Sequence, residues 1–337
     1  MTPYDSARQL VAPDLLAFEQ ELEAMLARQG DYLTDHERQL YRRGKRLRPL
    51  LLLLSAHAAS ATPLGQLPPK AIAAALSLEL AHVGSLIHDD IVDRAPLRRG
   101  LPTIHASRGY ELALIVGDLQ WVMATRLMAG FVQTPSDIEL MREFLEAGEV
   151  TCRGQLDEML LAPPDDVAAL IQRYYRTIDR KTGKLLSFSC EAGARLVDGL
   201  PTAVGSLQRY GALLGRAFQV MDDILDIVRP TEAAGKESLT DLRAGRLSLP
   251  LLYALREAPA SHPLHQLRLG QTLTPAELEA SADLLRRGPG WLHAFADARA
   301  LVAHARRQLD LMQPSPYLEA LHGLAQHLVD QGFLAAG

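Results

Sequence analysis

The 337-residue sequence predicts an all-α fold, a single helical domain over residues 1–337, and three observations lead to it. Hydrophobic residues make up 48% of the chain; Ala and Leu dominate them and β-branched runs are scarce, a bias that favours helices. Apolar residues recur at three- and four-residue steps in almost every long segment. No internal repeat or low-complexity linker separates one part of the chain from another.

The N-terminal half is expected to supply the central helices. One amphipathic helix is marked by Leu15, Phe18, Leu22 and Met25. Residues 70–93 are apolar nearly all round, which predicts a buried helix, and residues 112–131 are expected to be buried in the same way. Glu79 and His82 interrupt the first of these segments, so we interpret it as a core helix and not as a membrane span.

Helices in the C-terminal half are recognised by the residues that begin them. Residues 274–277, Thr-Pro-Ala-Glu, combine an N-cap, a proline at the first helical position and a glutamate that completes a capping box. Ser315 and Pro316 repeat the cap-and-proline pattern before the last helix. Asp165 or Asp166 is expected to cap a helix that follows a double proline.

Composition argues against several classes of protein. A formal net charge of −5 and only 5% aromatic residues argue against a nucleic-acid-binding surface. Cys152 and Cys190 are too few for a disulfide framework, so we expect both in the core of a reduced, cytoplasmic protein. We expect no signal peptide, because Asp5 and Arg8 precede any apolar run. The longest such run, residues 50–54, is too short to cross a bilayer, so the protein is not expected to be integral to a membrane.

An aspartate motif, Asp89, Asp90 and Asp93, ends the first central helix. Asp89 and Asp93 are four residues apart and share a helix face, whereas Asp90 is rotated away by about 100°. Two carboxylates roughly 5–6 Å apart repel by about 3 kcal/mol at an effective dielectric near 20, and apolar neighbours add a desolvation cost. A bound Mg²⁺ would relieve both, because it prefers one or two carboxylates together with water and phosphate oxygens. His82 lies two turns earlier on the same face, where a core position and a phosphate contact are equally compatible with the sequence.

A second aspartate motif, Asp222, Asp223 and Asp226, repeats this spacing in another apolar segment and follows Gln219. A single acidic cluster is usually a solvated helix face or a helix cap. Chance recurrence of the same spacing in two buried helices is improbable, so the second motif favours a functional interpretation of both. Two such motifs facing each other could hold several Mg²⁺ ions on one diphosphate.

Cationic groups accompany the two motifs. Arg98 and Arg99 follow the first motif in a loop, and Lys45 and Arg48 open a leucine-rich helix. A guanidinium binds phosphate through two parallel hydrogen bonds, whereas an ammonium acts as a point charge. Such pairs are usually solvated surface groups, but beside paired carboxylates they indicate diphosphate ligands. Weaker cationic candidates are Lys181, Lys236 and Arg246.

Several segments occur in the order typical of one enzyme family: Gly-Lys-Arg-Leu-Arg-Pro at 44–49, residues 97–103 behind the first motif, Gly117-Asp118, Lys181-Thr182-Gly183, and Phe218-Gln219 before Asp222-Asp223. Over about residues 40–250 the sequence resembles the trans-isoprenyl diphosphate synthases, also called polyprenyl synthetases. The resemblance implies helices around a deep central cavity and a homodimer. It also implies Mg²⁺-dependent, head-to-tail condensation of isopentenyl diphosphate with an allylic diphosphate.

The resemblance implies roles for individual residues as well. Mg²⁺ would be bound by Asp89, Asp93 and Asp222, with support from Asp90, Asp223 and Asp226. The allylic diphosphate would be held by Arg98, Lys181 and Lys236. Isopentenyl diphosphate would be held by Lys45, Arg48, His82 and Arg99, and Gln219 would lie near the reacting carbons. One departure is Gly245-Arg246, where the family usually has Gly-Lys, and it leaves the role of Arg246 open.

Two other functions are compatible with parts of the pattern. A class I terpene cyclase also uses an aspartate-rich helix and Mg²⁺, but it rarely needs a second diphosphate site. Its cavity would need aromatic walls to guide cations, and this chain is only 5% aromatic. A non-catalytic partner subunit of a synthase would be expected to lack one aspartate motif. Both motifs are intact here, which favours the condensing enzyme.

The helix that carries Asp89 also predicts the product length, because the growing chain is expected to run down it. Ser85 and Gly84 lie roughly 6–7.5 Å below Asp89, and Ala81 lies about 12 Å below, at helical rise. All three are small, so Leu78, roughly 16 Å down, is the first bulky residue. This predicts a product longer than farnesyl diphosphate, with C25 or beyond favoured over C20. Alternatively, Gly84 and Ser85 only allow close helix packing, or a neighbouring helix closes the cavity.

Overall fold

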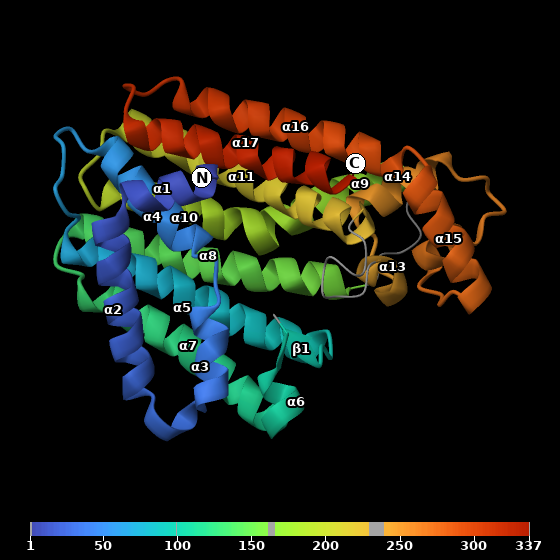
Figure 1. Ribbon diagram of the computed structural model, residues 1–337, viewed down its shortest axis with the longest axis horizontal. Coiled ribbons are helices and arrows are strands. Elements are labelled where there is room, and N and C mark those ends of the chain that lie inside the picture. Colours follow the sequence, from blue (N-terminus) through green and yellow to red (C-terminus); the bar gives the residue numbers. More distant parts are fainter. Residues whose placement is uncertain (1, 99, 161–165, 229–238, 337) are drawn as a thin grey trace. The chain divides into compact units, whose positions relative to one another are not determined.

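The computed structural model describes residues 2–98, 100–160, 166–228 and 239–336, and helices dominate it (Figure 1). The strands in these ranges are β1 (Leu97–Arg98) and β2 (Leu101–Pro102), which pair as one short antiparallel hairpin. The all-α prediction is confirmed. The chain divides into two compact units: unit 1 is Met1–Gly148, Phe188–Gln208 and Met312–Leu321, and unit 2 is Glu149–Ser187, Arg209–Leu311 and His322–Gly337. A single domain stays a prediction.

Unit 1 contains the N-terminal helices. They are α1 (Pro3–Leu10), α2 (Ala12–Arg28), the 3-10 turn η1 (Gly30–Tyr32), α3 (Asp35–Arg42), α4 (Leu47–Ala59), α5 (Pro69–Val92), α6 (Ile104–Arg108) and α7 (Tyr110–Gly130). Helix α5 is the centre of this unit, because it packs against α2, α4, α6 and α7. Buried residues occur along its length, from Ala71 to Asp90, so the predicted core helix at residues 70–93 is confirmed.

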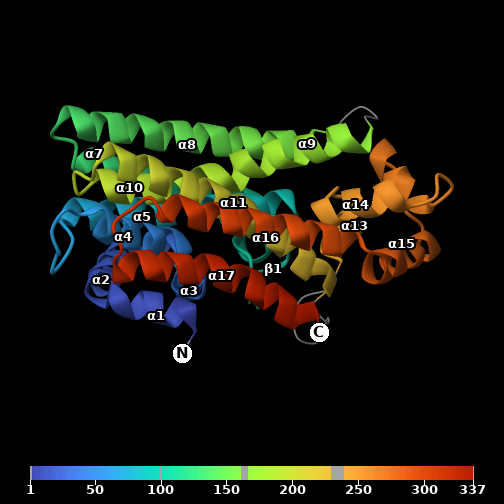
Figure 2. The same ribbon diagram turned by 90° about the horizontal axis from the view of Figure 1, so that it is seen from above.

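Unit 2 contains most of the C-terminal helices (Figure 2). They are α9 (Val167–Ile178), the π-helical turn η2 (Asp179–Gly183), α13 (Thr240–Ala244), α14 (Leu249–Glu257), the 3-10 helix η3 (Pro263–Leu269), α15 (Pro275–Arg287) and α16 (Gly290–Leu309). Helices α8 (Pro135–Met159), α10 (Lys184–Arg195), α11 (Pro201–Val228) and α17 (Pro316–Ala336) contribute residues to both units. The core of unit 2 forms where α14 packs against α9, α15 and α16, around buried Leu251, Leu252 and Leu255.

The predicted helix starts are confirmed. Thr274 and Glu277 form a reciprocal capping box, in which the Thr274 N–H donates to the Glu277 carboxylate at 2.8 Å. Asp166 caps α9 through its side chain. The Ser315 hydroxyl accepts a hydrogen bond from the Leu318 N–H at 3.3 Å, at the start of α17.

Two predictions about burial are wrong. Residues 112–131 were expected to be buried all round, but Leu114, Ile115 and Val122 of α7 are 49%, 62% and 63% exposed. The reason is that α7 packs one face against α5 and leaves the opposite face uncovered. Helices α5 and α7 are both long and apolar enough to span a membrane by length and composition. The apolar stretch of α5 is 72% buried, whereas that of α7 is only 33% buried. Cys190 is buried as predicted, whereas Cys152 is exposed on α8.

Candidate functional site

The first aspartate motif ends helix α5. Val92 is the last helical residue, so Asp93 is the C-cap, and its N–H donates to the Asp89 carbonyl oxygen at 2.8 Å. Asp89 is half-buried and Asp93 is exposed. Both carboxylates stand at the negative end of the helix dipole, and the last turn of α5 contains no basic residue. The carboxylates and the helix end therefore favour a bound cation together.

The middle carboxylate of this motif, Asp90, is held by Arg98. Asp90 is 4% exposed, and the Arg98 Nε donates to its Oδ1 at 2.7 Å. Burial raises the pKa of Asp90 above its ordinary value, and the charge of Arg98 opposes that rise. The hairpin that carries Arg98 is closed by Thr103, whose hydroxyl donates to the Ala95 carbonyl oxygen at 2.8 Å. Arg98, predicted to hold the allylic diphosphate, is thereby fixed beside the motif.

The turn between α3 and α4 is fixed by a buried arginine, Arg46. Its backbone is left-handed, with φ of 55°, and its side chain is 2% exposed. The guanidinium donates to Glu79 of α5 at 2.7 Å and to Glu19 of α2 at 3.1 Å. Two carboxylates on two helices therefore hold the turn that contains Lys45.

The two cations predicted to bind isopentenyl diphosphate in this segment differ in setting. Lys45 is exposed. Arg48 is half-buried, and its Nε is buried without a hydrogen-bond partner among the residues that the structure describes. Burial lowers the pKa of Arg48 to about 10, and Glu79 opposes this shift. The guanidinium is still charged at neutral pH, so an anion would supply the missing hydrogen-bond acceptor and further negative charge.

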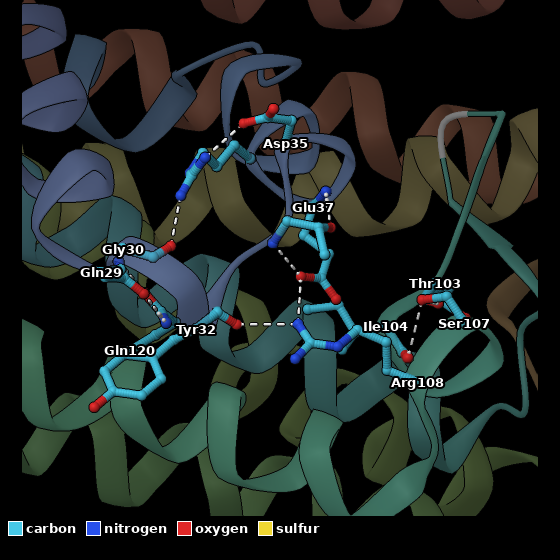
Figure 3. Close-up of polar contacts among 12 residues, drawn as sticks. Gln29, Gly30, Tyr32, Asp35, Glu37, Thr103, Ile104, Ser107, Arg108 and Gln120 are labelled. Carbon is cyan, nitrogen blue, oxygen red and sulfur yellow. Dashed lines mark hydrogen bonds and ion pairs between the residues drawn. The ribbon is translucent and has the colours of Figure 1, made fainter.

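A partly buried ion pair joins the segment before Lys45 to the segment after Arg98 (Figure 3). Glu37 of α3 is 1% exposed, and it accepts hydrogen bonds from Arg108 Nη1 at 2.8 Å and from the Thr34 N–H at 2.7 Å. Arg108 is the last residue of α6, which follows the hairpin. The Glu37–Arg108 pair therefore ties together the two segments that carry the predicted diphosphate ligands of unit 1.

Two histidines on α5 lie near the first motif. His82 is half-buried, two turns before the motif. The His88 Nε2 lies 3.2 Å from the Leu114 carbonyl oxygen and 3.4 Å from the Asp118 carboxylate on α7. Gly117 provides the necessary space, because a Cβ there would lie 2.3 Å from the same nitrogen. The Gly117-Asp118 pair thus lets α7 approach the end of α5.

The second aspartate motif lies inside helix α11. Asp222 is exposed, whereas Asp223 is 6% exposed. Asp223 accepts hydrogen bonds from the Tyr174 hydroxyl at 2.6 Å and from Gln219 Nε2 at 3.1 Å. Burial raises the pKa of Asp223 to about 7, although both hydrogen bonds act to lower it. The Gln219 Oε1 accepts from the Thr182 hydroxyl at 3.0 Å, so this amide has one defined orientation.

The third carboxylate of this motif, Asp226, holds the start of α13. It accepts hydrogen bonds from the Thr240 hydroxyl at 2.7 Å and from the Asp241 N–H at 3.1 Å. Burial and then the nearby carboxylates of Asp223 and Asp226 raise the pKa of Asp241 well above its ordinary value. Arg246 Nη1 lies 4.0 Å from the Asp241 carboxylate. Arg246, whose role was open from the sequence, is therefore a countercharge of Asp241.

Lys181 and Thr182 lie in the π-helical turn η2, which joins α9 to α10. The closing backbone hydrogen bond of this turn spans five residues, one more than in an α-helix. The Lys181 ammonium forms an ion pair with Glu158 of α8. Close packing holds the turn against α11, because a Cβ at Gly215 would lie only 2.8 Å from the Gly183 Cα.

The predicted residues fall into two groups, one in each unit. Unit 1 contains Lys45, Arg48, His82, Asp89, Asp90, Asp93 and Arg98, and unit 2 contains Lys181, Gln219, Asp222, Asp223 and Asp226. Arg99 and Lys236 lie outside the described residues. That the two aspartate motifs face each other stays a prediction.

The carboxylates have the chemistry that magnesium requires. Within the described ranges, no three or more His, Cys, Asp or Glu side chains converge as a metal cage. Mg²⁺ rarely needs such a cage, because it is usually held by one or two carboxylates, water and substrate phosphates. Asp93 and Asp222 are exposed hard oxygen donors, unlike the buried Asp90 and Asp223. The donor set therefore fits a metal that is shared with a diphosphate.

Sequence reasoning missed four residues that position the predicted ones. Glu37 and Arg108 are 71 residues apart, and Tyr174 is 49 residues from Asp223. Glu158 is 23 residues from Lys181. No local spacing connects these partners. The one usable signal was a Glu three residues after Thr34, which predicts the capping box at the start of α3.

A family model described as "Polyprenyl synthetase" matches residues 31–283 of the chain. The chain is 32% identical over 320 residues to the nonaprenyl diphosphate synthase of Mycobacterium tuberculosis, covering 93% of this chain and 91% of the relative. It is also 32% identical over 298 residues to a (2E,6E)-farnesyl diphosphate synthase of the same organism, covering 86% and 80%. These two relatives have the same percentage identity to the chain, although their names give different product lengths.

Solved structures show the same fold. The polyprenyl synthase of Caulobacter crescentus, in complex with calcium and isoprenyl diphosphate, has a TM-score of 0.83 to this chain at 26% identity. The alignment covers 97% of both chains.

Proposed function

Because this chain belongs to the polyprenyl synthetase family, we propose that it condenses isopentenyl diphosphate head-to-tail with an allylic diphosphate. The product is a trans-polyprenyl diphosphate, which we propose to be C20 or longer. The enzyme is a transferase of prenyl groups that acts in isoprenoid biosynthesis.

The observation that carries the proposal is the setting of Arg48. A buried guanidinium nitrogen without an acceptor costs stability unless a ligand supplies one. Lys45, three residues earlier, adds a second positive charge on a turn that Arg46 holds in place. This cationic segment is separate in sequence from Arg98 and Lys181, the cations assigned to the allylic diphosphate. Two diphosphate sites are what a condensing enzyme needs and what a terpene cyclase rarely needs.

The proposed reaction begins when the bond between the allylic carbon and the diphosphate oxygen breaks. Both electrons leave with the diphosphate, and Arg98 and Lys181 stabilise the negative charge that develops on it. The double bond of isopentenyl diphosphate, held by Lys45, Arg48, His82 and Arg99, forms the new carbon–carbon bond to the allylic cation. A proton is then lost from the adjacent carbon to the released diphosphate, which completes the balance.

We assign Mg²⁺ to Asp89, Asp93 and Asp222. When bound, Mg²⁺ supplies positive charge to the departing diphosphate. Asp90, Asp223 and Asp226 already accept hydrogen bonds from Arg98, from Tyr174 and Gln219, and from Thr240, so we assign them supporting roles through water. Gln219 is oriented by Thr182 and Asp223, and we place its amide near the reacting carbons.

We further propose a homodimer in the cytoplasm, with the uncovered face of α7 at its interface. Leu114, Ile115 and Val122 are about half exposed or more, and Val122 lies seven residues after Ile115 and eight after Leu114, that is, about two turns along the same side of the helix. An uncovered apolar face of this kind is typical of a protein–protein interface. A two-fold axis would pair the same face of each copy. Light scattering at micromolar concentration should show a dimer, and Ile115→Glu with Val122→Glu should give a monomer. A monomeric wild type would end this assignment.

The proposed activity is tested by incubating the purified protein alone with Mg²⁺, isopentenyl diphosphate and allylic primers of several lengths. A condensing enzyme elongates the primer and releases diphosphate. A cyclase consumes the primer without using isopentenyl diphosphate. A non-catalytic subunit leaves both substrates intact, and that result would refute the proposal.

A further inference from the structure

The π-helical turn η2 is attached to helix α11 through Arg216. The Arg216 Nε donates to Asp179 Oδ1 at 2.7 Å, and its Nη2 donates to Asp179 Oδ2 at 2.5 Å. Two parallel hydrogen bonds of this kind fix the angle between a guanidinium and a carboxylate as well as their distance. Because Asp179 is the first residue of η2, this pair sets where the turn begins on α11.

The guanidinium of Arg216 is held on its face as well as on its edge. It lies over the ring of Tyr175, with the Arg216 Cζ 5.5 Å from the ring centroid, which is a cation–π distance. The Tyr175 hydroxyl donates to the carboxylate of Asp297 on α16 at 2.8 Å, so the ring has a defined position. None of these contacts involves a residue that we assign to a substrate or to Mg²⁺. Arg216 is therefore a fixed cation outside the assigned ligand set.

A second contact joins the same turn to the same helix. The Thr182 hydroxyl donates to Gln219 Oε1 at 3.0 Å. Thr182 lies three residues after Asp179, and Gln219 lies three residues after Arg216. The two contacts are therefore about one helical turn apart on both elements. A displacement of η2 at Asp179 would move the hydroxyl that orients the Gln219 amide.

The hydrogen bond between Thr182 and Gln219 leaves little tolerance for such a displacement. A donor and an acceptor separated by more than about 3.5 Å no longer form a hydrogen bond, so a shift of roughly 0.5 Å away from α11 is enough to break it. Gln219 would then keep the hydrogen bond from its Nε2 to Asp223, but its amide oxygen would lose the Thr182 donor. The orientation of the amide thus depends on how firmly η2 is held.

We propose that Arg216 is a positioning residue for the reaction. By binding Asp179 through two hydrogen bonds, it holds η2 so that Thr182 orients the Gln219 amide. This inference rests on the proposed function, which places that amide near the reacting carbons. Loss of Arg216 should lower turnover by about tenfold, because a misplacement of about 1 Å at a reacting centre can cost up to about 10²-fold. Binding of isopentenyl diphosphate should change little, since the residues assigned to it lie on other segments.

The test is a double-mutant cycle on turnover, with wild type, Arg216→Ala, Thr182→Val and the double variant. Each protein is supplied with Mg²⁺, an allylic primer and saturating isopentenyl diphosphate. Each single variant should lose about tenfold in turnover. The double variant should lose at most about twofold more than either single variant, because both changes break the same hydrogen bond. The Michaelis constant for isopentenyl diphosphate should stay within about twofold of the wild-type value.

Arg209→Ala is the matched control. Arg209 lies two turns before Arg216 on α11, is exposed, and donates from its Nε to the Gln308 side chain at 2.8 Å. The control therefore removes an arginine and a side-chain contact from the same helix without touching η2, and its turnover should equal that of the wild type. Where Arg216→Ala does not fold, as judged by its thermal unfolding, Asp179→Asn takes its place in the cycle, because it weakens the same pair from the other side.

Wild-type turnover in folded Arg216→Ala would overturn the inference. So would losses that multiply in the double variant to about 100-fold, because the two residues would then act independently. A wild type that elongates no primer would instead overturn the proposed function, so the two failures are distinguishable.

Discussion

The two aspartate motifs share one spacing but hold their middle carboxylates differently. Asp90 and Asp223 are both almost fully buried, at 4% and 6% exposure. Asp90 is neutralised by the guanidinium of Arg98, whereas Asp223 accepts hydrogen bonds from two uncharged groups, Tyr174 and Gln219. Burial raises the pKa of both. The charge of Arg98 opposes the rise in Asp90, whereas hydrogen bonds from uncharged groups oppose it in Asp223, whose pKa reaches about 7.

This difference follows from where each motif lies along its helix. The first motif ends α5, so the chain turns back through the hairpin and can deliver Arg98 to Asp90 from only eight residues away. The second motif lies inside α11, and its partners must come from α9 and from the preceding turn of α11 itself. Equal sequence patterns therefore predict equal donor atoms but not equal electrostatic surroundings.

The largest effect should come from removing one exposed or half-exposed carboxylate of either motif. Asp89→Ala and Asp222→Ala should each lower turnover by about 10²-fold or more, because charge on the leaving diphosphate then goes uncompensated. The fold should persist, with unchanged thermal unfolding. Asp283→Ala on α15, which removes an exposed carboxylate paired with Arg287, is the control and should keep full activity. Near-normal turnover in either motif variant would contradict the metal assignment.

A smaller effect should distinguish Asp90, which is held by a cation, from Asp223, which is held by uncharged groups. Arg98→Ala leaves Asp90 buried and unpaired and also removes a phosphate ligand, so it should raise the allylic Michaelis constant, by about 1.5–3 kcal/mol of binding. Tyr174→Phe leaves Asp223 its hydrogen bond from Gln219. The loss of allylic binding free energy in this variant should be less than half of the loss in Arg98→Ala.

Lys45→Ala serves as the reciprocal variant, since it should raise the Michaelis constant for isopentenyl diphosphate and spare the allylic one. Steady-state kinetics with each substrate varied in turn gives both constants. Equal increases of the allylic Michaelis constant in Arg98→Ala and Tyr174→Phe would contradict the distinction between the two motifs.

Glu37, like Asp90, is a buried carboxylate held by a guanidinium, but it lies outside the aspartate motifs. Removing Arg108 tests whether such a pair stabilises the fold. Arg108→Ala leaves Glu37 buried at 1% exposure with only its helix-capping hydrogen bonds. The free energy of unfolding should fall by about 2 kcal/mol, less than for a fully buried pair, because the Arg108 side chain is 30% exposed. Denaturant unfolding measures this loss. Arg153→Ala, which removes an ion pair with Glu149 in which both side chains are more than 60% exposed, should cost much less.

The smallest effect should come from a third arrangement, in which two carboxyl groups share one guanidinium. Arg195 donates from Nη2 to Glu143 at 2.8 Å and from Nε to Glu191 at 3.0 Å, and Gln208 donates to the other oxygen of Glu191. Burial, and then the adjacent Glu191, raises the pKa of Glu143 from 4.5 to about 7. The folded state therefore binds this proton more tightly than the unfolded chain does.

The sign of the pH dependence follows from that raised pKa. The contribution to stability is fully present below about pH 4.5 and is lost as the pH rises through about 7. Glu143→Gln stays uncharged, so the wild type should lose about 1 kcal/mol relative to it between these limits, after allowance for partial exposure. Urea unfolding of both proteins at pH 4.5 and 7.5 checks this. Parallel pH profiles would show that Glu143 ionises normally.

Much of the fold was predictable because apolar periodicity reports which helices form. The prediction of residues 70–93 for α5 differs from the observed helix by one residue at each end. The same reasoning failed for α7, since periodicity reports how apolar a helix is and not what covers it. Leu114 and Ile115 are apolar in sequence but exposed in this chain.

The candidate site was predictable as a set of residue types, and not as a set of contacts. Spacing alone identified Asp89 and Asp222, because four-residue steps share a helix face. The partners that set their surroundings are distant in sequence, as Tyr174 is from Asp223. The sequence also could not show what lies beside Gly84, which packs closely against α7, with the Gly117 carbonyl oxygen 3.0 Å from an added Cβ. The product length stays a prediction.

The π-helical turn at Asp179–Gly183 has a consequence for which mutations the gene tolerates. A π-turn is an α-helical turn with one additional residue, so losing a single codon in this stretch would let α9 and α10 join as one regular helix. Every residue on one side of the deletion would then rotate by about 100° relative to the other side. After a deletion at Asp179, Arg180 or Gly183, Thr182 would no longer reach Gln219 and Lys181 would no longer reach Glu158, although all four side chains would still be encoded. An in-frame deletion here should therefore do more harm than most substitutions at the same positions.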